Sequence, residues 1–156
     1  MSQERPTATA QLVTLGIENE VFAVPVEMVL EILDTRRVTK LPDAPAWILG
    51  LIDVRGRSVP VMDLRTRLGL PRVPATEHSR ILVLDVPGDG GRLVAGLVVD
   101  RVFEITALDP PGAEPPPDMG GAWRSDHVCA VGRRNEGFVI ILNVPHLLRG
   151  TEAVPA

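Results

Sequence analysis

Short apolar runs alternate with turn-forming residues along almost the whole chain. The 156 residues include 14 glycines and 15 prolines, and 45% of the residues are hydrophobic. Such a composition supports a buried core, while glycine and proline repeatedly interrupt long helices and strands. The longest apolar runs, such as residues 94–99, fall far below the roughly 20 residues of a membrane-spanning helix. We therefore expect many short strands, a mainly β fold and no direct membrane insertion.

Four pairs of apolar runs, each separated by a turn signal, predict four hairpins. In the first turn Asn19 suits the left-handed conformation, and Arg55-Gly56 forms the second turn. Pro60 places its strand at a sheet edge or at a bulge, because proline has no N–H to donate. The paired runs are residues 12–15 with 21–24, 51–54 with 58–62, 80–86 with 92–99, and 128–131 with 138–142.

Two short helices are also expected. Residues 26–33 carry apolar side chains at helical spacing, with two glutamates on the opposite face. Residues 42–50 form a second candidate of about two turns, in which Asp43 caps the start and Gly50 closes the end.

The two halves of the chain repeat one pattern. Residues 26–32 and 99–105 both read V-acid-x-V-x-E-I, and each segment follows a predicted hairpin. A second shared pattern joins residues 61–64 and 141–144, each followed four residues later by a leucine. The repetition predicts a pseudo-duplicated protein of two similar small β-barrels, which also protects the edges of so many short strands.

The predicted organisation is one folded domain between two tails. Residues 11–149 form the domain, with a first barrel at about 11–79 and a second at 80–149, and with strand exchange between them allowed. Residues 1–10 and 150–156 hold little to bury and are expected to be disordered tails. A proline-rich stretch at 109–117 is expected to be an extended connector.

The residues that catalysis, cofactors or metals require do not come together in this sequence. His78, His127 and His146 stand in separate contexts and favour solvated surface positions, with no metal site. Cys129 lies in an apolar strand, where a buried thiol is a poor nucleophile. No glycine-rich phosphate loop is present. We therefore expect no enzymatic activity and no cofactor.

Charge and aromatic content exclude further partners. The formal net charge is −4, aromatic residues make up 3% of the chain, and tyrosine is absent. A nucleic-acid binder needs basic patches and stacking platforms, so this class is not supported.

The centre of the chain carries a specific motif. Residues 41–56 read LPDAPAWILGLIDVRG, and residues 59–64 continue with VPVMDL. This succession of a Pro-x-x-Pro segment, an Arg-Gly turn and a Pro-Val-x-Asp-Leu strand resembles the CheW-like family of chemotaxis coupling proteins. The resemblance extends over residues 12–148.

The resemblance implies a fold of two SH3-like, five-stranded β-barrel subdomains and a non-catalytic adaptor function. A family member joins the cytoplasmic tip of a methyl-accepting chemoreceptor to the regulatory domain of a CheA-type histidine kinase, itself a related double barrel. The expected location is therefore the cytoplasm, at membrane-associated receptor arrays.

The resemblance also carries the family's receptor-binding positions onto Arg55, Gly56, Val29, Glu31 and Gly50. Arg55 would hold carboxylates or carbonyls of the receptor with its planar guanidinium, while Gly56 lets the chain turn. A solvated hairpin arginine is the alternative for Arg55, and Val29 also fits a core position.

Kinase binding maps by the same resemblance onto Val38, Leu41 and Pro42, where exposed apolar residues suit a reversible interface. One departure from the family is Asp53, which stands where asparagine is usual and places a carboxylate beside Arg55.

Two alternatives remain open at this level. The chain is a scaffold of a non-motility chemosensory pathway, or it is a small β-barrel ligand-binding protein. The latter requires a convergent polar pocket, for which the sequence offers no candidate.

Overall fold

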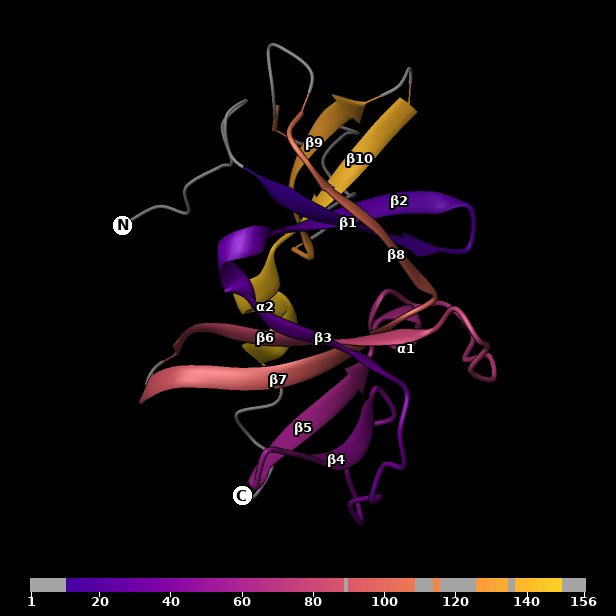
Figure 1. The fold of residues 1–156 in the computed structure, drawn as a ribbon, viewed down its shortest axis with the longest axis vertical. Helices are drawn as coiled ribbons and strands as arrows, with labels where there is room; N and C mark the ends of the chain where they lie inside the picture. The colour runs from indigo at the N-terminus through magenta and orange to yellow at the C-terminus, as the bar shows by residue number, and fades with distance from the viewer. Residues whose placement is uncertain (1–10, 89, 109–113, 116–125, 135–136, 150–156) are drawn as a thin grey trace.

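Two five-stranded sheets, each strongly curled, make up the protein (Figure 1). The computed structural model describes residues 11–88, 90–108, 114–115, 126–134 and 137–149. Sheet A consists, in spatial order, of β8 (Arg101–Thr106), β1 (Leu12–Ile17), β2 (Glu20–Pro25), β10 (Gly137–Leu142) and β9 (Val128–Arg134). Sheet B consists of β3 (Val29–Asp34), β6 (Arg80–Gly88), β7 (Gly91–Val99), β5 (Arg57–Asp63) and β4 (Ile48–Val54).

All four expected hairpins are present, as β1–β2, β4–β5, β6–β7 and β9–β10. In the first turn the left-handed residue is Glu18, with φ 57°, rather than Asn19. Pro60 does not mark an edge strand, because β5 lies between β4 and β7. The ladder with β7 begins one residue later, at Val61, so the missing N–H of Pro60 costs no bond there.

Neither expected helix forms as predicted. Residues 26–33 divide into a single 3-10 turn, η1 (Val26–Met28), and strand β3. Side chains along β3 alternate between half-buried and exposed, and the strand pairs with β6, so the sheet partner overrides a pattern that also fits a helix. Residues 42–47 form turns, with Asp43 left-handed at φ 60°, and residues 48–50 already belong to β4.

Neither sheet is built from one half of the chain alone. Sheet A combines β1 and β2 with β8, β9 and β10, whereas sheet B holds β3 to β7. Parallel pairing of β2 with β10 and of β5 with β7 completes the two sheets. The boundary expected at residue 79 therefore does not separate the sheets. The expected connector and tails lie outside the described residues, apart from 114–115, where Glu114 bridges to Val131.

The internal duplication is visible in the strand order. Replacing β3, β6, β7, β5 and β4 by β8, β1, β2, β10 and β9 converts the order of sheet B into that of sheet A. The two V-acid-x-V-x-E-I segments lie where the chain crosses from one sheet to the other and enters an edge strand, β3 or β8. The repeated sequence thus encodes an equivalent structural step.

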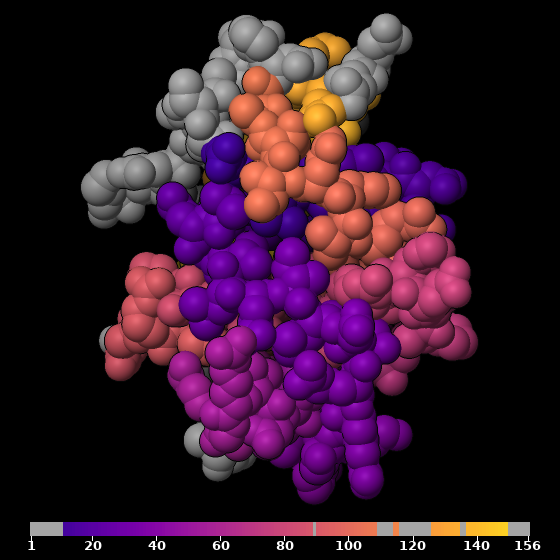
Figure 2. Space-filling view, viewed as in Figure 1, coloured from indigo at the N-terminus to yellow at the C-terminus, as the bar shows by residue number. Residues whose placement is uncertain are grey.

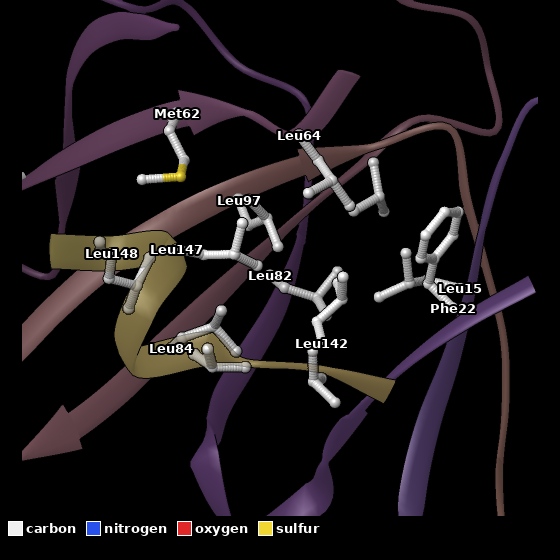
Figure 3. Close-up of a cluster of buried hydrophobic side chains, with 14 of the residues drawn as sticks. Leu15, Phe22, Met62, Leu64, Leu82, Leu84, Leu97, Leu142, Leu147 and Leu148 are labelled. Carbon is white, nitrogen blue, oxygen red and sulfur yellow. The ribbon is translucent and has the colours of Figure 1, made fainter. Parts of the chain in front are cut away.

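Three apolar clusters hold the fold together. The largest lies between the sheets, where side chains of both sheets and of the C-terminal helix α2 (Val144–Leu148) converge (Figure 3). Each of the two smaller clusters belongs to one sheet, one to sheet A together with Leu108 and the other to sheet B. Trp47 packs against the large cluster, with the guanidinium of Arg67 4.3 Å from its ring centroid. Arg67, on α1 (Leu64–Arg67), also donates to carbonyls of α2, which ties both helices to the core.

A partly buried ion pair joins the two sheets beside this core. Arg65, on α1, donates to both carboxylate oxygens of Asp100 over 2.9 and 2.8 Å, and it also pairs with Glu18. Asp100 lies where the chain crosses from sheet B to sheet A, and Glu18 lies in the β1–β2 turn. The backbone N–H of Glu18 donates to Asp100 over 2.8 Å. We call these three residues the clasp.

Charge pairing in the clasp outweighs the cost of burial. Burial alone would raise the pKa of Asp100, but hydrogen bonds from Arg65 and from the Glu18 backbone hold that pKa below its ordinary value. The hydrogen bond to Asp100 likewise raises the pKa of Arg65. Both groups therefore stay charged at neutral pH, and loss of Asp100 would leave the buried Arg65 without its bidentate partner.

Replacement of Arg65 tests the clasp. Arg65→Leu is expected to lower the free energy of unfolding by about 3 kcal/mol, because Asp100 loses its bidentate partner. Arg55→Leu is the matched control, since the Arg55 side chain is 82% exposed in its pair with Glu31, and it should cost less than about 1 kcal/mol. Urea unfolding measures both; equal losses would show that the clasp does not stabilise the fold.

Candidate binding site

Sheet B curls around a groove that brings together two of the sequence-predicted residues, Arg55 and Glu31. Arg55 and Glu31 meet across it, with Nε 3.3 Å from Oε2 and Nη2 3.4 Å from Oε1. Beside them Leu30 is 53% exposed. The groove has a volume of about 300 Å³. We call it the first mouth, and it is lined by Leu30, Glu31, Val54, Arg55, Arg57, Val59, Val83 and Val94.

The tight β4–β5 turn places Arg55 at this groove. Arg55 and Gly56 both have positive φ, 53° and 84°, which is the geometry of a two-residue hairpin turn. A carboxylate oxygen of Asp53 accepts the Gly56 N–H over 2.9 Å and braces the turn. Asp53 is therefore engaged with the backbone, and the carboxylate paired with Arg55 is that of Glu31.

Val29 and Leu30 have opposite surroundings. Val29 is half-buried, packs against the cluster between the sheets and does not line the first mouth. Leu30 takes the exposed position beside Glu31, aided by a register irregularity between Val29 and Glu31. Helical spacing groups Val29 with Leu30 on one buried face, so the sequence does not predict Leu30 as a residue of the site. Alternation along a strand that contains a bulge would predict it.

Gly50 is buried and lies away from the lining of the first mouth. Its φ is 144°, and a Cβ there would come within 2.0 Å of the Thr39 carbonyl oxygen. Thr39 and Leu51 exchange two backbone hydrogen bonds of 2.8 Å beside it. The structure thus gives Gly50 a packing role, in which its missing side chain lets the segment after β3 lie against β4.

The three candidate kinase-binding residues lie on the segment between β3 and β4. Val38 is half-buried against the cluster inside sheet B, Leu41 is half-buried and Pro42 is exposed. None of them lines the first mouth. Val38 also lines a hollow of about 160 Å³ that reaches Arg65 and Asp100 of the clasp. Arg55 and Glu31 therefore lie at the first mouth, whereas the candidate kinase-binding residues lie outside it.

Two histidines that are distant in sequence come together at the base of α2. The rings of His127 and His146 lie 5.1 Å apart, and the described residues offer no hydrogen-bond partner to the buried Nδ1 of His127. His127 is thus half-buried rather than the solvated residue that the sequence indicated. Burial, aided by Arg67 and His146, lowers its pKa. Sequence spacing contained no signal for this contact.

Neither a metal site nor a membrane-spanning helix is found among the residues that the structure describes. They contain no group of three or more His, Cys, Asp or Glu side chains arranged to hold a metal ion. Within the same ranges, no helix is both long and apolar enough to cross a membrane.

Comparison with known proteins identifies the family. The profile of the CheW-like domain matches residues 11–152. The chain belongs to the CheW-like domain family. One relative, the chemotaxis protein CheW of Klebsiella aerogenes, is 29% identical over 139 residues, covering 89% of this chain and 80% of that protein. Protein FrzA of Myxococcus xanthus is 33% identical over 130 residues, covering 82% of this chain and 78% of FrzA.

A solved structure of the family has the same fold. The scaffolding protein TtCheW from Thermoanaerobacter tengcongensis superposes with a TM-score of 0.78 at 28% identity, covering 89% of this chain and 92% of TtCheW. The expected mainly β, pseudo-duplicated architecture of the CheW-like family is therefore confirmed.

Two glycine variants separate packing from binding. Gly50→Ala is expected to lower the free energy of unfolding by about 3 kcal/mol, because its Cβ would overlap the Thr39 carbonyl. Gly56→Ala meets open space and should cost about 1 kcal/mol, for the left-handed backbone alone. Thermal and urea unfolding measure the difference. A Gly50→Ala protein as stable as Gly56→Ala would contradict the packing role.

The lowered pKa of His127 makes the free energy of unfolding sensitive to acid. In the unfolded chain a histidine titrates near pH ~6.5, whereas the folded protein holds the pKa of His127 lower. The unfolded chain thus binds more protons between those two pKa values, so the free energy of unfolding falls as pH decreases through that window. Urea midpoints from pH 7.5 to 5 should show this fall. His127→Gln should flatten it, while the exposed control His78→Gln should retain the wild-type slope.

Proposed function

We propose that this CheW-like protein is a non-catalytic chemotaxis adaptor that couples methyl-accepting chemoreceptors to a CheA-type histidine kinase. It works without a cofactor, in the cytoplasm, and reaches the membrane only through the receptors. The observation that carries the proposal is the Arg55–Glu31 pair beside exposed Leu30 at the first mouth. Membership of the family and the likeness to a scaffolding protein support it.

The first mouth suits one face of a helical receptor tip. Leu30 and the valines of the groove offer apolar contact, while Arg55 offers a planar, bidentate donor for a carboxylate or carbonyl group. An exposed ion pair contributes little stability, so Arg55 exchanges Glu31 for a receptor group at small cost. Glu31 meanwhile holds the arginine over the groove, which reduces the entropy lost on binding.

The kinase regulatory domain is assigned to the segment that carries Val38, Leu41 and Pro42. Pro42 is exposed and Leu41 half-buried, as in a reversible apolar contact. Because these residues lie outside the first mouth, both partners are able to bind at once. The adaptor function would then consist of holding two partners together through sheet B.

The pathway served is either flagellar chemotaxis or another chemosensory output. The 33% identity with FrzA, over most of both chains, keeps the second candidate beside the first. Deletion of the gene separates them: loss of swimming bias indicates motility, whereas unchanged swimming with an altered surface behaviour indicates the other output.

Arg55 provides the direct test. Arg55→Ala is expected to weaken binding of a receptor-tip fragment at least about tenfold, with unchanged affinity for the kinase regulatory domain. The matched control is Arg92→Ala, which removes a similarly exposed hairpin arginine from its pair with Asp85. Isothermal titration measures the affinities of the wild-type protein and of both variants for the two partners.

The outcomes are distinct. If Arg92→Ala weakens receptor binding as much as Arg55→Ala does, the first mouth is not the receptor site. If neither partner binds the wild-type protein at high micromolar concentration, the adaptor function itself is wrong.

A further inference from the structure

The strand correspondence between the sheets predicts a counterpart of the first mouth on sheet A, and such a groove exists. The strand ladders give equivalent positions in the two sheets. Val59 of sheet B corresponds to Val139 of sheet A, and Val94 of sheet B corresponds to Val21 of sheet A. The counterpart has a volume of about 610 Å³. We call it the second mouth, and it is lined by Thr14, Val21, Val102, Phe103, Glu104, Arg134, Gly137, Phe138 and Val139.

An ion pair of the same kind crosses this groove. Glu104, on edge strand β8, pairs with Arg134 at the end of β9, as Glu31 on β3 pairs with Arg55. Arg134 also donates to the hydroxyl of Thr106 over 2.6 Å. These side-chain bonds tie edge strand β8 to β9 across the opening. An added β-strand is therefore a poor occupant, because the side chains of Glu104, Thr106 and Arg134 already link the two edge strands.

The second mouth is more apolar at its rim than the first. Phe103 is 50% exposed and Phe138 59% exposed, and together they are two of the three phenylalanines in the chain. The position equivalent to Phe138 in sheet B is Ser58. Phe103 lies over Gly16, whose missing Cβ leaves room for the ring. Exposed aromatic residues on both sides of a hollow are typical of a binding surface rather than of a solvated one.

Positive charge accompanies these rings. The guanidinium of Arg133 lies 4.7 Å from the centroid of the Phe138 ring, and Arg134 is next in sequence. Arg101, on β8, adds a third cation near Phe103. Arg134 and Glu104 are the charged residues of the lining, whereas Arg133 and Arg101 flank the groove without lining it. These flanking cations contrast with a net charge of −4 for the chain. An occupant with carboxylates beside its apolar residues complements this surface.

We propose that the second mouth binds an acidic amphipathic helix, independently of the first mouth. Apolar residues spaced three and four apart enter the hollow between Phe103 and Phe138, and flanking carboxylates meet Arg133 and Arg134. Figure 2 shows the β8 segment, in orange, at the surface on the same face as the purple first half of the chain. The protein thereby presents two separate helix-binding grooves, one on each sheet.

Synthetic helical peptides test the proposal on the full-length chain. The probe is a fluorescent peptide of about 18 residues with a leucine stripe flanked by glutamates, and its control carries lysines instead. Anisotropy titration should show that the glutamate peptide binds at least about tenfold more tightly than the lysine peptide. Phe138→Ser, which copies the first mouth, and Arg133→Glu should each weaken it at least about tenfold.

Matched variants make the result decisive. Both altered side chains are exposed, so circular dichroism should show wild-type folding. Ile32→Ser, at an exposed apolar residue that lines neither mouth, should leave peptide affinity unchanged. Equal affinity for the two peptides, or equal weakening by Ile32→Ser and Phe138→Ser, would overturn the proposal.

The binding of natural partners to the wild-type protein and to the same variants is then measured. A receptor-tip fragment whose binding falls with Phe138→Ser would supply the helix and support the proposal. Loss of kinase regulatory domain binding or of self-association with Phe138→Ser, without an effect on the peptide, would overturn it, because those partners present barrels rather than helices.

Discussion

The apolar layer between the two sheets is the constraint on which the rest of the structure depends. Both sheets and α2 contribute side chains to it, and several leucines there are fully buried. A sheet built from a single half of the chain would still need this second surface to cover its apolar face. Exchange of strands between the halves adds backbone ladders within each sheet, so neither sheet is complete without both halves of the chain.

The clasp fixes the position of the sheets beside that layer. Apolar contacts are non-directional, whereas the bidentate bond from Arg65 to Asp100 has one geometry. It holds the point where the chain enters β8, and thereby the edge strand that carries the second mouth. The same edge position in sheet B carries Leu30 and Glu31 of the first mouth. Both grooves thus take residues from the edge strands of the duplicated sheets, beside the shared core.

Local sequence rules succeeded where contacts are local. The hairpins were predictable because turn residues such as Gly56 and alternating runs act within a few positions. The two helices were wrong for the same reason: residues 26–33 satisfy helical spacing, but β6, some 50 residues away, offers a ladder that wins. The Arg55–Glu31 pair also joins distant segments, and family resemblance, rather than spacing, had brought its two residues to attention.

By itself the sequence determined a mainly β, duplicated chain, its hairpins, and its membership of the CheW-like family, because turn chemistry and repeated motifs are properties of neighbouring residues. Only the tertiary structure decided which strands share a sheet, that Val29 is packed while Leu30 is exposed, and that Gly50 serves packing. It alone brought His127 to His146 and placed Phe103 and Phe138 around one groove. Such contacts join distant segments, and their energies depend on burial and pairing that exist only after the chain has folded.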